Sequence, residues 1–342
     1  MHRIYNRQDY LIFLDNSYIK DFLNKNINKY FPGFIACLKV ESCYFRVLAA
    51  TSFLVRYFVT LKSKHGHEWT LRMRGNRLNP TSYKILSYLW QTHGYKKYYY
   101  PRPIYYFKKQ SFILYENYDG MIYRDYHRKS KYFFNKTVPM IAKRLADLHR
   151  TPKKMTKVRT LNDEFAHLEE ILLKIKNNHQ PYYSTASEVI AIIKNYIATN
   201  YQIKNFTLIH NDFQASNIIY NRYGKNMGII DYEQFCVFFP TIDVVTFTTH
   251  LKTVVRNILP EQGQLALQKK FIKYYLKYTK QKNLAKIKRD LPYFMARSLL
   301  DIMAVSAVYL SLSRHDQQKE KFREFIAYLE KEIAKLLPII RK

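Results

Sequence analysis

The sequence predicts an α+β protein of two lobes, a small antiparallel β-sheet lobe and a larger, mainly helical lobe. At 342 residues the chain is long enough for two lobes with a sizeable core. Residues 42–75 have the pattern of a meander of strands, and residues 251–342 have the pattern of helices without a repeat. We expect a helical N-terminal extension over residues 1–41, the small lobe over 42–118 and the large lobe over 119–342.

The elements of the first lobe follow from local signals. Apolar side chains at helical spacing predict an amphipathic helical entry over residues 1–40. Within the meander, His65-Gly66 closes a hairpin, because Gly adopts the backbone angles of a tight turn at little cost. A helix follows over 79–93, with Asn79 as its N-cap and Pro80 at its first position.

The second lobe is predicted to be built of helices. The sequence indicates helices over 135–150, 162–178 and 186–199, the last announced by a capping box of Thr185 and Glu188. An amphipathic helix over 319–337 ends the chain. An apolar run over 294–312 is interrupted by charged residues, so we expect a buried helix and no transmembrane segment.

Composition bears on compartment and partners. The N-terminus lacks the apolar core of a signal peptide, and Cys37, Cys43 and Cys236 show no paired spacing. These features predict a cytoplasmic protein without a zinc site. A formal charge of +31 favours an anionic substrate, surface or nucleic acid, whereas 32 Tyr and only 8 Gly suggest a bias of codon usage instead. The lysines over 269–288 alternate with aromatic residues, which fits either an anionic acceptor or a solvated helix face.

One stretch carries the chemistry. Residues 207–233 predict a short strand ending at His210, a loop with Asp212 and Asn217, and a hairpin that delivers Asp231. The spacing His-x-Asp-x-x-x-x-Asn matches the catalytic loop of kinases. Phosphoryl transfer needs one carboxylate near the attacking hydroxyl and hard oxygen ligands for Mg²⁺, and these residue types supply both.

This stretch resembles the aminoglycoside phosphotransferase and choline kinase family. The resemblance lies in His210-Asn-Asp-Phe-Gln-Ala-Ser-Asn217, in Ile-Ile-Asp231-Tyr-Glu233, and in Pro240 and Asp243 downstream. The family typically has Gly where this chain has Asn211. The resemblance covers about residues 42–250 and implies a bilobal protein-kinase-like fold with a nucleotide-binding small lobe and a catalytic, acceptor-binding large lobe.

The resemblance also implies roles and cofactors, ATP and Mg²⁺. Asp212 would be the catalytic base, and Asn217 and Asp231 the metal ligands. Asp243 would brace the catalytic loop. His149, in a Leu-Ala-Asp-Leu-His segment like that of the family, is interpreted as a packing or loop-bracing residue.

In the small lobe the family pattern is weaker. Ala49-Ala-Thr-Ser52 stands where a glycine loop is expected, and Arg72, or Arg74, stands where the phosphate-binding Lys is expected. Arg holds phosphate oxygens bidentately but differs from Lys in size and hydration. The helix over 79–93 offers no acid to pair with that cation.

Residues 111–120 resemble the last small-lobe strand and the hinge of the family. The backbone of Glu116, Asn117 and Tyr118 would bind adenine. Gly120 permits the chain reversal that a linker needs.

Three functions are consistent with the sequence. The first is an ATP- and Mg²⁺-dependent kinase of a small-molecule hydroxyl on a sugar, an amino alcohol, or an anionic glycan or lipid head group. The net charge makes a polycationic aminoglycoside a poorer fit. The second is a non-catalytic, nucleotide-binding, pseudokinase-like protein associated with a spore or an envelope. The third, a nucleic-acid binder, rests on charge without a supporting motif.

Overall fold

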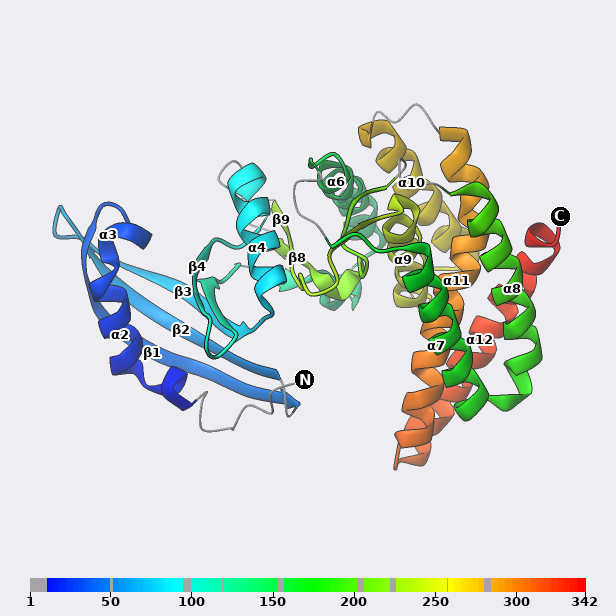
Figure 1. Ribbon diagram of the computed structural model, residues 1–342, viewed down its shortest axis with the longest axis horizontal. Helices are drawn as coiled ribbons and strands as arrows, with labels where there is room; N and C mark the ends of the chain where they lie inside the picture. The colour runs from blue at the N-terminus through cyan, green and yellow to red at the C-terminus, as the bar shows by residue number, and fades with distance from the viewer. Residues whose placement is uncertain are drawn as a thin grey trace. The chain divides into compact units, whose positions relative to one another are not determined.

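The chain forms two compact units. The computed structural model describes residues 11–49, 52–94, 100–118, 120–128, 130–152, 157–201, 206–221, 226–256, 258–279 and 284–342. One unit contains the described residues up to Ile122 together with Asn217–Gln234, and the other contains Tyr123–Ser216 and Phe235–Lys342. The first is built around a β-sheet and the second is mainly helical (Figure 1), which confirms the predicted α+β class.

The first unit contains a five-stranded sheet in which all neighbouring strands are antiparallel. In sheet order the strands are β1 (Phe34–Ala49), β2 (Ser52–Ser63), β3 (Glu68–Arg77), β5 (Phe112–Glu116) and β4 (Pro103–Phe107). Along β2 the side chains of Val55, Tyr57 and Val59 are fully buried whereas Arg56 and Phe58 are exposed. This alternation buries one face of the strand. The predicted hairpin is confirmed, with Gly66 at φ +82°.

Two short helices cover this face of the sheet, α2 (Asn16–Lys25) and α3 (Ile27–Tyr30). Figure 1 shows α2 beside β1, and the Asn24 side chain bonds both the N–H and the carbonyl of Cys37. The prediction that residues 1–40 are helical was wrong from Phe34 onward. Gly33, at φ +101°, turns the chain there. The strand that follows pairs with β2, so tertiary pairing overrides the helical pattern.

The helix α4 (Pro80–Leu89) confirms the predicted capping, because the Asn79 Oδ1 accepts from the Ser82 N–H at 2.8 Å. A π-helical turn, η2 (Trp90–Gly94), follows it. Among the described residues, five further strands lie outside the large sheet.

Three of these strands form a small sheet in the order β6-β8-β9: β6 (Met121–Ile122), β8 (Ile218–Asn221) and β9 (Asn226–Ile229). Because β6 pairs with β8, the segment Asn217–Gln234 belongs to the first unit. The sequence had placed that segment within an unbroken large lobe. The turn of the predicted hairpin that delivers Asp231, at Arg222-Tyr223-Gly224, lies outside the described residues.

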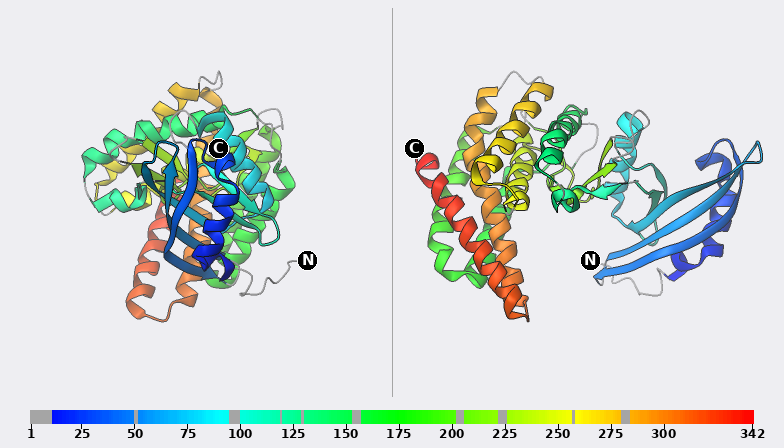
Figure 2. Two further views of the ribbon diagram at one scale, coloured as in Figure 1. Left: turned by 90° about the vertical axis from the view of Figure 1, so that its left-hand side faces the viewer. Right: turned by 180° about the vertical axis from the view of Figure 1, so that it is seen from behind.

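The second unit is a helical assembly with one short strand pair, β7 (Thr207–Ile209) and β10 (Cys236–Phe238). Figure 2 shows its long helices stacked along one another, with α12 beside α11. Their bounds are α6 (Lys131–His149), α7 (Leu161–Asn178), α8 (Tyr183–Asn200), α9 (Pro240–Val255), α10 (Glu261–Thr279), α11 (Leu284–Leu312) and α12 (Asp316–Ile340). Short 3₁₀-helical segments are η3 (Tyr123–Arg128), η4 (Gln180–Tyr182) and η6 (Ala215–Asn217), together with η1 (Ile12–Leu14) in the first unit.

The predicted capping box at Thr185 and Glu188 was wrong. The turn η4 leads directly into α8, which already begins at Tyr183, so Thr185 lies inside the helix. The capping box is at α7 instead, where Thr160 and Asp163 bond each other's backbone N–H groups. A capping pattern is local, and the preceding turn decides whether a helix can begin there.

Among the described residues one helical stretch, Ile287–Leu312, is long and apolar enough to span a membrane. Half of its apolar window is buried within the unit. Its polar side chains have partners inside the core. Asp290 accepts from Tyr196 at 2.5 Å, and Arg297 donates to Glu164 at 2.5 Å. These contacts are those of a core helix, as the sequence predicted for this segment.

The basic stretch of α10 has the arrangement of a solvated helix face. Lys269, Lys273 and Lys277 are exposed, whereas Phe271 and Tyr275 are fully buried. The part of the stretch at Lys280 and Lys282 lies outside the described residues. The exposed lysines lie four residues apart, so they line one side of the helix.

Because of His250, on α9, we expect the stability of the fold to fall in acid. Burial lowers the pKa of His250 to about 4, against a smaller opposing effect of Asp301. Between that value and the ordinary 6.5, the unfolded chain binds the proton more tightly, so stability falls as the pH falls through this window. We expect the difference in Tm between pH 7.5 and pH 5 to be smaller in His250→Gln than in the wild type. Thermal denaturation at both pH values measures it, and equal differences would contradict the assignment.

Candidate active site

The loop after β7 holds the candidate base. Pairing of β7 with β10 brings the chain to His210, which is fully buried with its ring 4.6 Å from that of Phe235. Asn211 then takes the left-handed conformation, with φ +66°. Asp212 follows, and η6 closes the loop. A left-handed residue other than Gly costs free energy and is often found at functional sites.

Asp243 holds this loop through hydrogen bonds to its backbone. Its carboxylate accepts the backbone N–H groups of His210 and Asn211, each at 2.7 Å. His149 lies 3.0 Å from the same carboxylate through Nε2, and its Nδ1 lies 2.7 Å from the Tyr275 hydroxyl. The bracing roles predicted for Asp243 and His149 are confirmed. Asp243 and His210 are fully buried and Asn211 is half-buried, so loss of the carboxylate would leave two N–H donors without their acceptor, at a cost of up to about 1–3 kcal/mol each.

The Asp212 side chain is half-buried and ordered by its own loop. Its carboxylate oxygens lie 2.9 and 3.1 Å from Gln214 Nε2, which donates to them. A carboxylate has about four acceptor positions. The Gln214 amide therefore orients the group.

In the first unit, Asn217 and Asp231 lie at the same end of the β8–β9 hairpin. Ile218 pairs with Ile229, and the Ile230 N–H donates to the Asn217 carbonyl at 3.0 Å. Asp231 follows directly, exposed and at φ +68°. No hydrogen bond or ion pair between described residues occupies its carboxylate.

The oxygen chemistry of this pair fits Mg²⁺. A carboxylate and an amide oxygen are hard ligands, and Mg²⁺ commonly keeps several waters beside few protein ligands. Across the described ranges, no three His, Cys, Asp or Glu side chains gather into a metal-binding group. That finding does not bear on a pair that includes Asn217.

In the predicted hinge, two backbone N–H groups donate to carbonyls of the first unit. The Glu116 N–H donates to the Arg102 carbonyl and the Asn117 N–H to the Arg72 carbonyl, both at 2.9 Å. Among the described residues the Tyr118 N–H is the donor of this segment without a partner. The Glu116 carboxylate pairs with Arg102 at 2.6 Å, although burial raises its pKa.

Gly228 and Gly120 lie where a side chain would collide with neighbouring groups. A Cβ on Gly228 would lie 2.7 Å from the Tyr118 ring. A Cβ on Gly120, at φ +148°, would lie 2.6 Å from the Tyr220 carbonyl oxygen. Both positions therefore require glycine, and the predicted reversal at Gly120 is confirmed.

Arg72 and Arg74 lie on the same face of β3, because they are two residues apart. Arg72 is exposed, with its guanidinium 5.7 Å from the Phe58 ring. Arg74 is half-buried and pairs across the sheet with Tyr115, and its buried Nε lacks a hydrogen-bond partner among the described residues. Burial raises the pKa of the Tyr115 hydroxyl. The positive charge of Arg74 lowers this pKa, and the negative charge of Asp231 raises it. The charges of Arg74 and Asp231 thus both affect the pKa of the Tyr115 hydroxyl.

The partner acid expected for a phosphate-binding cation is missing from α4, as the sequence predicted. Asp231 and Glu233 are acids of the first unit that lie beyond the hairpin. Glu233 has a raised pKa, from burial and from Asp231, which Arg77 opposes.

The sequence did not single out Arg159. Its guanidinium donates to the Asn211 side chain at 3.2 Å and pairs with Glu164 at 2.7 Å. The signal that was available is Asn211 itself, which replaces the glycine usual in the resembling family.

Comparisons with known proteins identify the family and the fold. A family profile described as "Phosphotransferase enzyme family" matches residues 52–282. A search of curated protein sequences gives no match.

Solved structures similar to the chain are kinases of small molecules. A choline kinase from Cryptosporidium parvum Iowa II is 16% identical, with 95% of this chain and 98% of that chain covered and a TM-score of 0.61. A Plasmodium vivax ethanolamine kinase is 17% identical, with coverage of 98% and 90% and a TM-score of 0.55. A spectinomycin phosphotransferase, solved with ADP and spectinomycin, is 12% identical, with coverage of 91% and 93% and a TM-score of 0.53. At these identities the likeness shows the fold, and the predicted kinase-like fold is confirmed.

Proposed function

The chain belongs to the phosphotransferase enzyme family, and from this premise we propose that it transfers the γ-phosphoryl group of ATP to a hydroxyl of a small molecule. The observation that carries the proposal is the placement of Asn217 and Asp231 at the same end of the β8–β9 hairpin, with Asn217 five residues after Asp212 of the braced loop. The ADP bound to the spectinomycin phosphotransferase supports nucleotide use.

Each residue has one task in this reaction. The hydroxyl oxygen of the acceptor forms a bond to the γ-phosphorus while the bond to the β-phosphate oxygen breaks and ADP leaves. Asp212 accepts the hydroxyl proton as this bond forms. Asn217 and Asp231 would hold Mg²⁺, which neutralises phosphate charge when bound. The Tyr118 N–H would bond the base, while Arg72 or Arg74 holds phosphate oxygens.

For the acceptor we propose a sugar, an amino alcohol, or an anionic glycan or lipid head group. The excess of positive charge, +31 over the chain, disfavours a polycationic aminoglycoside on electrostatic grounds. A thermal-shift titration with ATP and Mg²⁺ tests nucleotide binding first. ADP formation with a panel of these acceptors then tests transfer. A chain that gains no stability from ATP and Mg²⁺ would contradict the proposal.

A specific observation favours one alternative, a non-catalytic nucleotide-binding protein. The helix α4 carries no acid that could orient the strand cation. In that case ATP and Mg²⁺ would stabilise the chain without any turnover above that of Asp212→Asn.

The two arginines of β3 can be told apart by ligand. We expect Arg74→Ala to weaken the affinity for ATP at least tenfold and to change the affinity for adenosine little, because a guanidinium binds the phosphates and not the base. Arg72→Ala, at the exposed position two residues earlier, serves as the matched variant. Titration of both ligands into both variants measures the effect. A larger selective loss in Arg72→Ala would assign the phosphate contact to Arg72, and equal losses for ATP and adenosine would show a structural role.

A further inference from the structure

Asn211 needs support that a glycine would not need. It lies between the buried His210 and the candidate base Asp212, in the left-handed conformation. Asn tolerates this conformation better than most residues but less well than Gly. Its backbone N–H is already held by Asp243. What holds its side chain therefore decides how firmly the loop keeps this shape.

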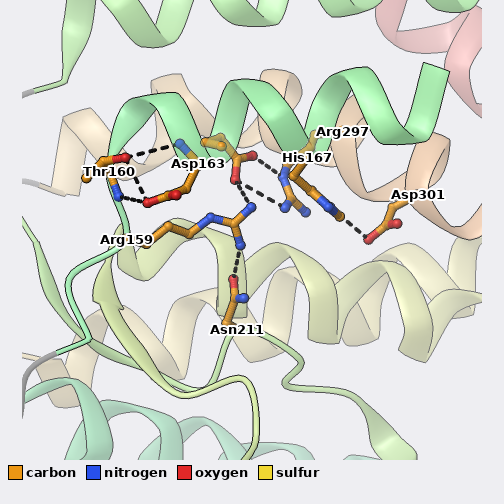
Figure 3. A network of polar contacts seen from close by, with 8 residues as sticks. Arg159, Thr160, Asp163, His167, Asn211, Arg297 and Asp301 are labelled. Atoms are coloured by element: carbon orange, nitrogen blue, oxygen red, sulfur yellow. Dashed lines mark hydrogen bonds and ion pairs between the residues drawn. The ribbon is translucent and has the colours of Figure 1, made fainter. Parts of the chain in front are cut away.

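Arg159 holds that side chain. Its Nη1 donates to Asn211 Oδ1 at 3.2 Å, and its Nη2 lies 2.7 Å from Glu164 Oε2 (Figure 3). The backbone N–H of Arg159 donates to the Val237 carbonyl at 3.1 Å, and its guanidinium lies 5.4 Å from the Phe238 ring. Both of these residues belong to β10, the partner strand of β7. Arg159 is thus fixed at its backbone, along its side chain and at its tip.

Glu164 connects this contact to the helical core. It is fully buried on α7, and its other oxygen accepts from Arg297 Nε at 2.5 Å on α11. Figure 3 shows the continuation along these two helices, where His167 pairs with Asp301 at 3.6 Å. A buried carboxylate is stable only when paired, so Glu164 is held between two arginines. Arg159 thus links Asn211 to a carboxylate, Glu164, that is itself held in the helical core.

We propose that Arg159 is a positioning residue that holds Asn211 in its left-handed conformation and thereby directs the Asp212 carboxylate toward the acceptor. This rests on the proposed function in one respect, the role of Asp212 as base. The loop is held from two sides, with Asp243 on its backbone N–H groups and Arg159 on its side chain. Arg159 uses a different nitrogen for each partner, Nη1 for Asn211 and Nη2 for Glu164, whereas a Lys at this position would offer one nitrogen in place of the two.

A double-mutant cycle of Arg159→Gln and Asn211→Gly tests the proposal. Arg159→Gln leaves Glu164 paired with Arg297, so the fold should survive. We expect it to lower kcat for ADP formation about ten- to a hundredfold with little change in the KM for ATP, as misplacement of a reacting group does. In the Asn211→Gly background the same change should alter kcat less than about twofold. Equal losses in both backgrounds would overturn the proposal.

Two further variants separate positioning from stability. Arg159→Lys keeps a cation beside Glu164, so we expect Tm to be largely retained and kcat to be lost as in Arg159→Gln. Lys252→Gln breaks a comparably buried ion pair with Glu332, away from the loop. It should lower Tm without changing kcat. A normal kcat in Arg159→Lys would overturn the need for a two-armed contact.

Amide hydrogen exchange makes the test independent of catalysis. Exchange in residues 207–216 should be faster in Arg159→Gln than in the wild type, and unchanged in Lys252→Gln. If the wild type shows no turnover with any acceptor, the proposed function fails, and this measurement still decides the role of Arg159. Unchanged exchange in Arg159→Gln would overturn the proposal whatever the activity.

Discussion

Replacing Asp212 by Asn is expected to lower phosphoryl transfer by about 10²–10⁴-fold, the usual contribution of a positioned general base. The substituted side chain keeps an oxygen that can accept from Gln214, which lies 2.9 Å from the carboxylate, so the loop should retain its shape. ATP affinity should stay close to that of the wild type, because the carboxylate is assigned to the acceptor. Purified proteins are compared by ADP formation, ATP titration and Tm.

Asp147→Asn is the matched control for this experiment. Asp147 is also a partly buried carboxylate of the second unit, but it pairs with Arg144 and Arg150 at the end of α6. We expect it to leave turnover unchanged. If Asp212→Asn instead lowers Tm strongly and turnover only in proportion to the folded fraction, Asp212 acts as a structural anchor. Binding of ATP and Mg²⁺ without turnover in the wild type would favour the non-catalytic function.

Loss of the Asp231 carboxylate is expected to abolish stabilisation by ATP and Mg²⁺. At a hundredfold excess of ligand over its Kd, this stabilisation is about 2.7 kcal/mol in the wild type. The left-handed backbone at φ +68° makes Asp231→Asn a cleaner change than Asp231→Ala, because Asn tolerates this conformation whereas Ala adds strain. Asn217→Ala should have a similar effect, since both side chains would hold the metal. Thermal shift with and without Mg²⁺ measures it.

Glu233→Gln is the control for charge alone. It removes one negative charge two residues beyond Asp231, and we expect the stabilisation by ATP and Mg²⁺ to persist. A full nucleotide-induced shift in Asp231→Asn would contradict the metal assignment. An equal loss in Glu233→Gln would show that the negative potential of the segment, and not a specific ligand, governs binding.

Local patterns were sufficient to predict much of this protein. Strand alternation, the glycine at the first hairpin and the Asn79 cap predicted elements that the structure contains. Each of these depends on residues within a few positions of one another. The spacing from His210 to Asn217 likewise predicted a loop and a hairpin, because short strands leave few ways to connect such residues.

Patterns failed where a neighbour distant in sequence decides the outcome. Residues 34–40 were included in the predicted helical entry, yet pairing with β2 makes them a strand. In the predicted hinge, contacts with the carbonyls of Arg102 and Arg72 use the N–H groups of Glu116 and Asn117, which the sequence did not indicate. Hydrogen bonds across a sheet depend on register, which no short window of sequence determines.

By itself, the sequence determined the class of fold and the residue types that phosphoryl transfer requires. The tertiary structure alone decided what holds those residues in place. His149 and Tyr275 meet across 126 positions of the chain, and Arg159 meets Asn211 across 52. Contacts of this kind form when packed helices bring buried polar groups together and leave each to be satisfied by whatever partner lies near. Local propensity carries no information about that partner, so the contacts that Tyr275 and Arg159 make with His149 and Asn211 became visible only in the folded chain.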